Sequence, residues 1–262
     1  MFDNILQEEK MFKVEGKVAI ITGPSGGIGK GVALKFAEAG LDIFGVDYAD
    51  CAELKKEIEE KYGVRFEYMR ADLTKTDTDL AESIVANAVD AFGRVDILVN
   101  NAGIARRCEA IDYKEEDWNA AITINLTTCF LLSQQVAKQY MKQGGGGKIV
   151  SLASMLAFSG GIRVPSYAAS KHGIAGITKA LCNEWAKYGI NVNAVAPGYV
   201  DTPMNKAHKD DPKRFKELND RIPFGRWATP EEIAGPILFL CTEEAKYING
   251  YVLAVDGGWL AR

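Results

Sequence analysis

The sequence has few residues of the kinds that bind metals or cross-link a chain. Its five cysteines stand far apart, no CxxC pair occurs, and the only histidines are His172 and His208. These counts argue against a zinc site and against a disulfide framework, and an odd number of cysteines suits a reducing compartment. We therefore expect a cytoplasmic protein that holds no metal ion.

Long apolar runs and an excess of one charge are also missing. The longest uncharged segment, Trp118–Ala137, contains eight Asn, Thr, Ser and Gln residues and is too polar for a membrane span. A net charge of −4 argues against a broad basic surface for nucleic acid or anionic lipid. The first ten residues, MFDNILQEEK, lack the basic start and apolar core of a signal peptide. We expect a soluble protein that binds neither nucleic acid nor membranes.

Short β-branched runs alternate along the chain with longer segments of helical periodicity. In residues 28–39, for example, Ile28, Val32 and Phe36 recur every four residues. This alternation predicts a single α/β domain in which a parallel sheet is covered by helices on both faces. The expected strands are Val18–Thr22, Ile43–Asp47, Val64–Arg70, Val95–Asn100, Lys148–Ala153, Ile190–Ala196 and Tyr251–Asp256.

Residues 199–228 are the only long stretch without a clear sheet strand. A loop of that length in a compact domain is often a lid or a binding loop. We expect this segment to shape a substrate pocket.

The first strand runs directly into the glycine-rich turn GPSGGIG, residues 23–29, and then into a helix. A helix N-terminus offers unpaired N–H groups and a positive dipole end, and glycines let a phosphate come close. The GxGxxG fingerprint and the Walker A loop are both absent, since Gly29-Lys30 is followed by Gly31. The turn is typical of a pyrophosphate site, although a turn that only lets strand and helix pack would look similar.

Asp47 ends the second strand, 24 residues after Gly23. A carboxylate at this point accepts hydrogen bonds from a ribose 2′-OH and repels a 2′-phosphate. No Lys or Arg lies in residues 23–29 or 44–52 to neutralise such a phosphate. The sequence therefore favours NAD over NADP, with Asp72 at the end of the third strand expected on the adenine side. Turn-forming roles are the alternative for both aspartates.

Tyr167 and Lys171 form the only YxxxK match in the chain. On a helix this spacing puts both side chains on one face, where an ammonium group favours the phenolate form of a tyrosine. A phenolate can act as a general base for an alcohol proton. Ser154 follows the strand Lys148–Ala153, at the edge where doubly wound sheets bind ligands, so its hydroxyl can hold a substrate oxygen. A strand-end cap is the alternative for Ser154.

Four motifs, in this order and spacing, resemble the short-chain dehydrogenase/reductase family over about residues 13–262. They are TGxxxGIG at 22–29, NNAG at 100–103, Ser154 with Tyr167-xxx-Lys171, and PGYVDT at 197–202. The resemblance implies a Rossmann-type, seven-stranded parallel sheet, binding of NAD(H) and a homotetramer. It also makes residues 1–12 an N-terminal extension and residues 199–228 the substrate loop.

The resemblance also implies a role for individual residues. Asn125, Ser154, Tyr167 and Lys171 match a catalytic tetrad. Ser154 would orient the substrate oxygen, Tyr167 would transfer its proton, and Lys171 would support Tyr167 and bind the nicotinamide ribose. Asn125 would hold a proton-relaying water, although without the resemblance it reads as a buried helical Asn bonded to backbone. The residues expected to bind the cofactor are Gly23, Ser25, Gly27, Ile28, Gly29, Asp47, Asp72, Leu73, Asn101, Ala102, Gly103, Tyr167, Lys171, Pro197, Gly198, Val200 and Thr202.

Within the family, segments such as NNAGIARR and NGYVLAVDGGWLAR are similar to dehydrogenases of deoxy and keto sugar acids. A carboxylate substrate suits Ser154 with Arg163 and with Arg106 or Arg107, since guanidinium groups bind carboxylates bidentately. Adjacent residues point apart, so at most one of that pair should face the pocket. Solvated surface arginines are the alternative. Gluconate, a polyol or a steroid are alternative substrates, and a catalytically inactive NAD(H)-sensing or scaffolding module is the alternative of another class.

The end of the sequence is apolar. Trp259, Leu260 and the expected strand Tyr251–Val255 would form an unfavourable patch if they were exposed. We expect a neighbouring subunit to cover them in the homotetramer.

Overall fold

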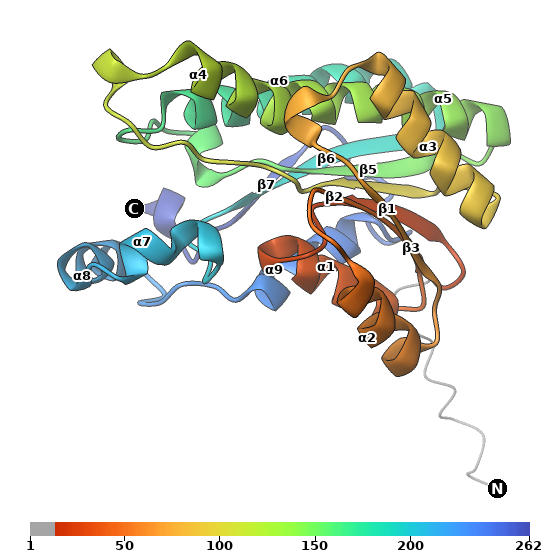
Figure 1. The fold of residues 1–262 in the computed structure, drawn as a ribbon, viewed down its shortest axis with the longest axis horizontal. Helices are drawn as coiled ribbons and strands as arrows, with labels where there is room; N and C mark the ends of the chain where they lie inside the picture. Colours follow the sequence, from red (N-terminus) through yellow and green to blue (C-terminus); the bar gives the residue numbers. More distant parts are fainter. Residues whose placement is uncertain (1–13) are drawn as a thin grey trace, which may run out of the picture.

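The computed structural model describes residues 14–262, so the expected extension at 1–12 lies outside the described residues. Seven parallel strands form one sheet between two layers of helices (Figure 1). The strand order is β3-β2-β1-β4-β5-β6-β7, which confirms the predicted doubly wound Rossmann-type fold. The strands are β1 (Val18–Thr22), β2 (Asp42–Asp47), β3 (Phe66–Arg70), β4 (Ile97–Asn100), β5 (Gly147–Leu152), β6 (Ile190–Pro197) and β7 (Val252–Val255).

Helices α3, α4, α5 and α6 cover one face of the sheet, and α1, α2 and α9 cover the other (Figure 1). The short helices α7 and α8 lie to one side of these layers. The α-helices are α1 (Gly27–Glu38), α2 (Ala52–Tyr62), α3 (Thr78–Phe92), α4 (Glu115–Ile122), α5 (Thr128–Gln143), α6 (Pro165–Trp185), α7 (Lys206–Lys209), α8 (Pro212–Arg221) and α9 (Pro230–Leu240).

The sheet is buried on both faces, which explains why its central strands read as nearly continuous apolar runs. Every residue of β1, β4 and β6 is buried. On one face, Phe36 of α1 and Ile237 of α9 pack into the core, and on the other Leu132 of α5 does so. Alternate residues of each strand therefore enter two separate cores.

The order of the strands reverses next to β1. That strand pairs with β2 on one side and with β4 on the other, so the chain crosses over from β3 to the far side of β1. Connections that leave β1 and β4 in opposite directions open a crevice beyond the carboxyl ends of these strands. This topology fixes where a ligand can bind.

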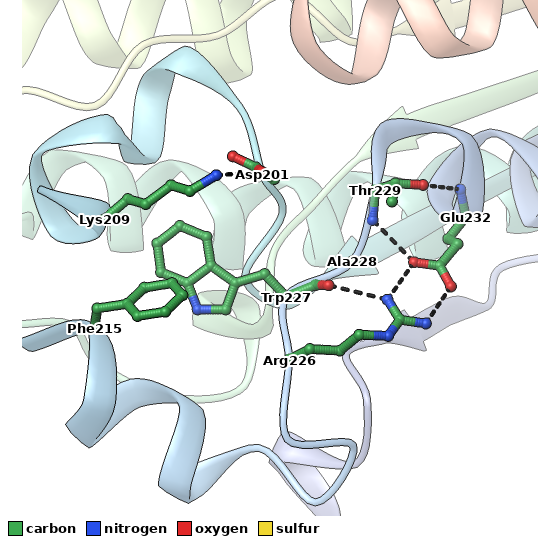
Figure 2. A pocket seen from close by; sticks show the side chains of 8 residues that line it. All are labelled: Asp201, Lys209, Phe215, Arg226, Trp227, Ala228, Thr229 and Glu232. Carbon is green, nitrogen blue, oxygen red and sulfur yellow. Dashed lines mark hydrogen bonds and ion pairs between the residues drawn. The ribbon is translucent and has the colours of Figure 1, made fainter. Parts of the chain in front are cut away.

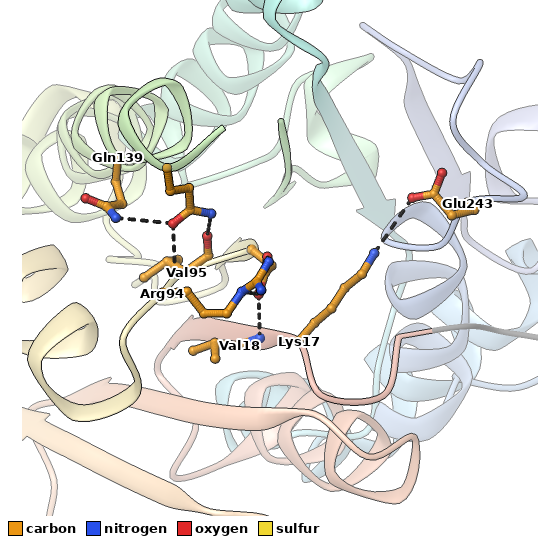
Figure 3. Close-up of polar contacts among 8 residues, drawn as sticks. Lys17, Val18, Arg94, Val95, Gln139 and Glu243 are labelled. Carbon is orange, nitrogen blue, oxygen red and sulfur yellow. Dashed lines mark hydrogen bonds and ion pairs between the residues drawn. The ribbon is translucent and has the colours of Figure 1, made fainter. Parts of the chain in front are cut away.

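Polar contacts close the opposite, amino-terminal edge of the sheet (Figure 3). The Asp96 carboxylate accepts a hydrogen bond of 3.0 Å from the backbone N–H of Val18 and pairs with Arg94 at 2.6 Å. Lys17 pairs with Glu243 at 3.7 Å beside them. The first residues of β1 are thereby tied to the segment that enters β4.

The helical stretch Glu115–Gln143 is long and apolar enough to cross a membrane by length and composition alone, the one such helix in residues 14–262. Half of its most apolar window is buried inside the protein, and core helices of soluble proteins pass the same test. In this fold α5 packs against β5 and α3.

The expected substrate loop at 199–228 is largely helical, which corrects the sequence-based interpretation. Two backbone N–H groups at the start of α8 donate to the Asp211 carboxylate, and Pro212 occupies the first helical position. Asp followed by Pro is a helix-start signal. Leu218 and Ile222 bury one face of α8, and a bridge between Val200 and Ala228 closes the segment at its base.

Candidate active site

A cavity of about 980 Å³ lies beyond the carboxyl ends of the central strands. Its volume is at the upper end of the range for ligand sites, about 300–1,000 Å³. Every residue predicted to bind the cofactor lines it, with the exception of Gly29. Residues from six separate stretches of chain thus meet where the topology opens a crevice.

The glycine turn has the geometry that a pyrophosphate needs. Gly23 and Gly27 have φ values of +70° and +52°, which favour glycine, and α1 starts at Gly27 with no side chain capping it. A helix start without a side-chain cap leaves its first N–H groups available to an anion. Gly29 supports the turn from behind, because a Cβ there would overlap the Gly23 carbonyl oxygen. Close packing therefore requires glycine at position 29, and its binding of the cofactor stays a prediction.

Thr22 and Asn101 lock this turn to the end of β4. Thr22 Oγ1 accepts hydrogen bonds of 2.9 Å from the backbone N–H groups of Asn101 and Ala102. The Asn101 side chain donates back to the carbonyl oxygens of Thr22 and Gly23, at 2.9 and 3.1 Å. The NNAG motif is therefore part of the wall that holds the nucleotide turn.

Asp47 lines the cavity at the end of β2. Its carboxylate accepts hydrogen bonds of 3.0 Å from the N–H groups of Ser25 and Ala49, which fixes it beside the glycine turn. The sheet places Arg70 of β3 in register with Asp47, and Arg70 donates to the Tyr48 carbonyl at 3.4 Å. Arg70 does not line the cavity, whereas Asp47 does.

Asp72 lines the adjoining wall, where it caps the short helix η1 (Leu73–Lys75). The Thr74 hydroxyl and backbone N–H both donate to this carboxylate, and they hold its pKa below the usual value. Asp72 therefore stays ionised at the cavity edge and shapes the turn that bears Leu73.

Tyr167, Lys171 and Ser154 all line the cavity at the end of β5. Lys171 Nζ lies 5.4 Å from the centre of the Tyr167 ring and donates to the Leu152 carbonyl, which ties α6 to β5. Ser154 Oγ accepts 3.1 Å from the N–H of Leu156, so its own hydrogen is left to donate. Within residues 14–262 the Tyr167 hydroxyl has no hydrogen-bond partner. The geometry suits proton transfer to or from a bound hydroxyl.

Asn125 lies behind the cavity wall and does not line it. It sits in the π-helical turn η3 (Thr123–Thr127), is fully buried, and pairs through both amide atoms with the backbone of Ile104, each at 2.9 Å. Its Nδ2 also donates to Ser170 Oγ, which donates to the Tyr167 carbonyl. These contacts are the ones that the alternative interpretation of Asn125 expects, namely those of a buried Asn bonded to backbone.

The sequence model of the family described as enoyl-(acyl carrier protein) reductase matches residues 23–260. A 2-dehydro-3-deoxy-D-gluconate 5-dehydrogenase from Dickeya dadantii is 50% identical over 251 residues, which cover 96% of this chain and 98% of that protein. The chain belongs to the short-chain dehydrogenase/reductase family.

Two solved structures of this family are 42% identical to the chain and cover 95% of it and 98% of their own lengths. One, from Beutenbergia cavernae, is provisionally described as an NAD(P)-dependent gluconate 5-dehydrogenase with bound NADP and has a TM-score of 0.90. The other, from Agrobacterium tumefaciens, is provisionally described as a 2-deoxy-D-gluconate 3-dehydrogenase with bound NADP and has a TM-score of 0.87.

The three arginines predicted to bind the substrate differ in whether they line the cavity. Arg106 lines the cavity and pairs with Asp117 at 3.5 Å. Arg107 lines it as well, because residues 101–109 have no strand geometry to point neighbours apart, which corrects the expectation of one facing residue. Arg163 pairs with Glu109 at 3.2 Å and does not line the cavity, so its predicted substrate role is not supported by its position.

The sequence analysis missed a second group of cavity-lining residues. They come from the segment 199–228 and from the end of the chain: Tyr199, His208, Arg214, Arg221 and Trp259. Arg214 and Arg221 are seven residues apart, a spacing that places both side chains on one face of a helix. This spacing indicates a shared site only when α8 is known to be a helix.

A smaller cavity of about 410 Å³ lies at the base of the same segment (Figure 2). Ion pairs of Asp201 with Lys209 and of Arg226 with Glu232 occupy its rim. The Arg226 guanidinium and the Thr229 N–H hold the pKa of Glu232 at about 2. These contacts anchor the segment, and we assign this cavity no ligand. Among the described residues, no group of three or more His, Cys, Asp or Glu is placed to hold a metal ion.

Replacing Asn125 with Ala tests its positioning role. The loss of its bonds leaves the buried backbone groups of Ile104 unpaired, which costs about 1–3 kcal/mol. We expect a lower Tm, weaker binding of the nicotinamide cofactor and lower kcat. Asn87→Ala, on the exposed face of α3, is the control. A variant with unchanged Tm and cofactor affinity but lower kcat would indicate a proton relay instead.

Proposed function

We propose that the protein is an NAD-dependent dehydrogenase that interconverts a secondary hydroxyl and a ketone on a deoxy or keto sugar acid. The substrates we favour are 2-dehydro-3-deoxy-D-gluconate and 2-deoxy-D-gluconate, the compounds in the names of its relatives. The observation that carries the proposal is the meeting of the glycine turn with Ser154, Tyr167 and Lys171 in one cavity. A cytoplasmic location suits the five cysteines, all of which are free thiols.

A nicotinamide cofactor held by the glycine turn and Asp47 would supply the chemistry of hydride transfer to or from the carbon that carries the substrate oxygen. Ser154 donates a hydrogen bond to the substrate oxygen and holds it next to Tyr167. In its phenolate form Tyr167 takes the proton of the alcohol during oxidation, and the Tyr167 hydroxyl so formed gives a proton to the ketone oxygen during reduction. Lys171 supplies a fixed positive charge beside the Tyr167 ring, which stabilises the phenolate form. Pro197, Gly198, Val200 and Thr202 would hold the nicotinamide end.

Tyr167→Phe tests this chemistry directly. The ring stays, so packing and NAD binding should be kept, while kcat should fall by about 10²–10⁴-fold because the proton-transfer group is lost. The measurement is NADH absorbance with a panel of sugar acids, and Tyr188→Phe, at an exposed tyrosine, is the control. Retention of more than about a tenth of wild-type kcat would refute the role of Tyr167. A wild-type protein that binds NAD(H) but turns over no member of the panel would favour the inactive sensing module.

Asp47 should make NAD the preferred cofactor, since a 2′-phosphate would meet its carboxylate. The kcat/KM ratio of NAD to NADP measures this preference, and Asp47→Ala should reduce it. Asp50→Asn removes a negative charge three residues further on, outside the cavity, and should leave the ratio unchanged. The related structures hold NADP, and equal kcat/KM values or a wild-type preference for NADP would refute the NAD assignment.

The surface that could join the subunits of the proposed homotetramer differs from the one expected from the sequence. Trp259 is 6% exposed and packs inside its own chain against Leu218 and Ile222, so no neighbour is needed to cover it. The sheet, however, ends at β7, whose outer edge is unpaired within residues 14–262, and Tyr251 beside it is 56% exposed. Unpaired edges favour association with another chain.

Light scattering at micromolar concentration measures the assembly. Four chains of 28.6 kDa should move as one particle, and Tyr251→Glu should shift the population to smaller species. A monomeric wild-type protein would contradict the proposal.

A further inference from the structure

Three guanidinium groups gather around Tyr199 at one end of the large cavity. Arg107 comes from the chain after β4, whereas Arg214 and Arg221 come from α8. Burial raises the pKa of Tyr199, and the positive charges of these three arginines act against that rise. Residues more than a hundred positions apart in the sequence therefore bring positive charge to the part of the cavity that contains Tyr199.

This cluster of Arg107, Arg214 and Arg221 carries an excess of positive charge. Arg214 pairs with Glu217 at 3.2 Å, but neither Arg107 nor Arg221 forms an ion pair with any carboxylate in residues 14–262. Arg107 donates to the Met204 carbonyl at 3.3 Å. Burial lowers the pKa of His208, and Arg107 and Arg214 lower it further, so the imidazole is neutral near pH 7. Of the three guanidinium groups, only that of Arg214 forms an ion pair within residues 14–262.

The end of the chain holds part of the cluster in place. The Arg221 guanidinium lies 4.0 Å from the centre of the Trp259 ring, a cation–π contact that fixes its position without neutralising its charge. Trp259 also packs edge-on against Tyr199, with ring centres 5.3 Å apart. Arg262 donates to the Asp220 carbonyl at 3.0 Å and joins the last residue to α8. The arginine side chains are therefore oriented before any ligand arrives.

We propose that Arg214 and Arg221 of α8, together with Arg107, form the subsite that binds the carboxylate of the substrate and selects an acid over a neutral sugar. Guanidinium groups bind carboxylates through two parallel N–H···O bonds. The cluster lines the same cavity as Ser154 and Tyr167. This inference rests on the proposed function and adds the side chains that set its substrate class.

The kinetic test compares an acid with a neutral analogue. Arg214→Gln and Arg221→Gln should each raise KM for 2-dehydro-3-deoxy-D-gluconate by about 10- to 100-fold, the range for a lost hydrogen bond to a charged group. KM for its methyl ester should change less than twofold, and Arg214→Lys should recover part of the loss. Lys213→Gln removes a charge from the same helix outside the cavity and is the control. Equal losses for acid and ester would overturn the proposal, because they would indicate a structural role.

A binding measurement separates this inference from the proposed function. Calorimetry follows D-gluconate binding to the wild-type protein, to Arg214→Gln and to Arg221→Gln in the presence of NADH. Binding that weakens at least tenfold in either variant supports the subsite, even if no sugar acid is turned over and the proposed function fails. Turnover of a sugar acid with unchanged KM and unchanged gluconate affinity in both glutamine variants overturns the subsite and leaves the proposed function standing. Absence of any gluconate binding to the wild type also overturns the subsite.

Discussion

The hydrogen bonds between Thr22 and Asn101 join the carboxyl ends of β1 and β4, where the order of the strands reverses. One side chain from each strand bonds to the backbone of the other, so the glycine turn and the NNAG segment cannot move independently. Because the turn and the NNAG segment lie so close together, position 29 requires glycine. A side chain there would overlap the Gly23 carbonyl and crowd Asn101. The crevice that opens at this point is the cavity to which every other element contributes.

The side chains to which we assign proton transfer are positioned by a second connection, between α6 and β5. Lys171 reaches from the helix to the Leu152 carbonyl at the end of β5, and Ser154 follows two residues later, just beyond the strand. Asn125 and Ser170 join the start of α6 to Ile104, just after the NNAG turn. The NNAG segment and the helix that carries Tyr167 and Lys171 are therefore parts of one hydrogen-bonded framework.

The segment 199–228 completes the cavity from the outside. Tyr199, Trp227 and Trp259 form a cluster of rings that carries α8, with Tyr199 and Trp227 stacked at 5.4 Å between centres. This packing is why the apolar end of the chain is buried in its own domain. Because α8 rests on aromatic contacts and its polar face looks into the cavity, the segment contributes charge as well as shape to the site.

The sequence by itself determined the features that depend on neighbours in the chain. Strand runs, the glycine turn and the four-residue spacing of Tyr167 and Lys171 are local patterns, and each appears in the structure where the pattern put it. Which distant segments of the chain lie next to one another was decided only by the tertiary structure. It sets Arg70 beside Asp47, turns Arg163 toward Glu109, buries Asn125 behind the wall and brings Arg214 to Arg107. Periodicity fixes how a segment folds locally, whereas the charges that share a cavity depend on how helices and strands pack across the sheet.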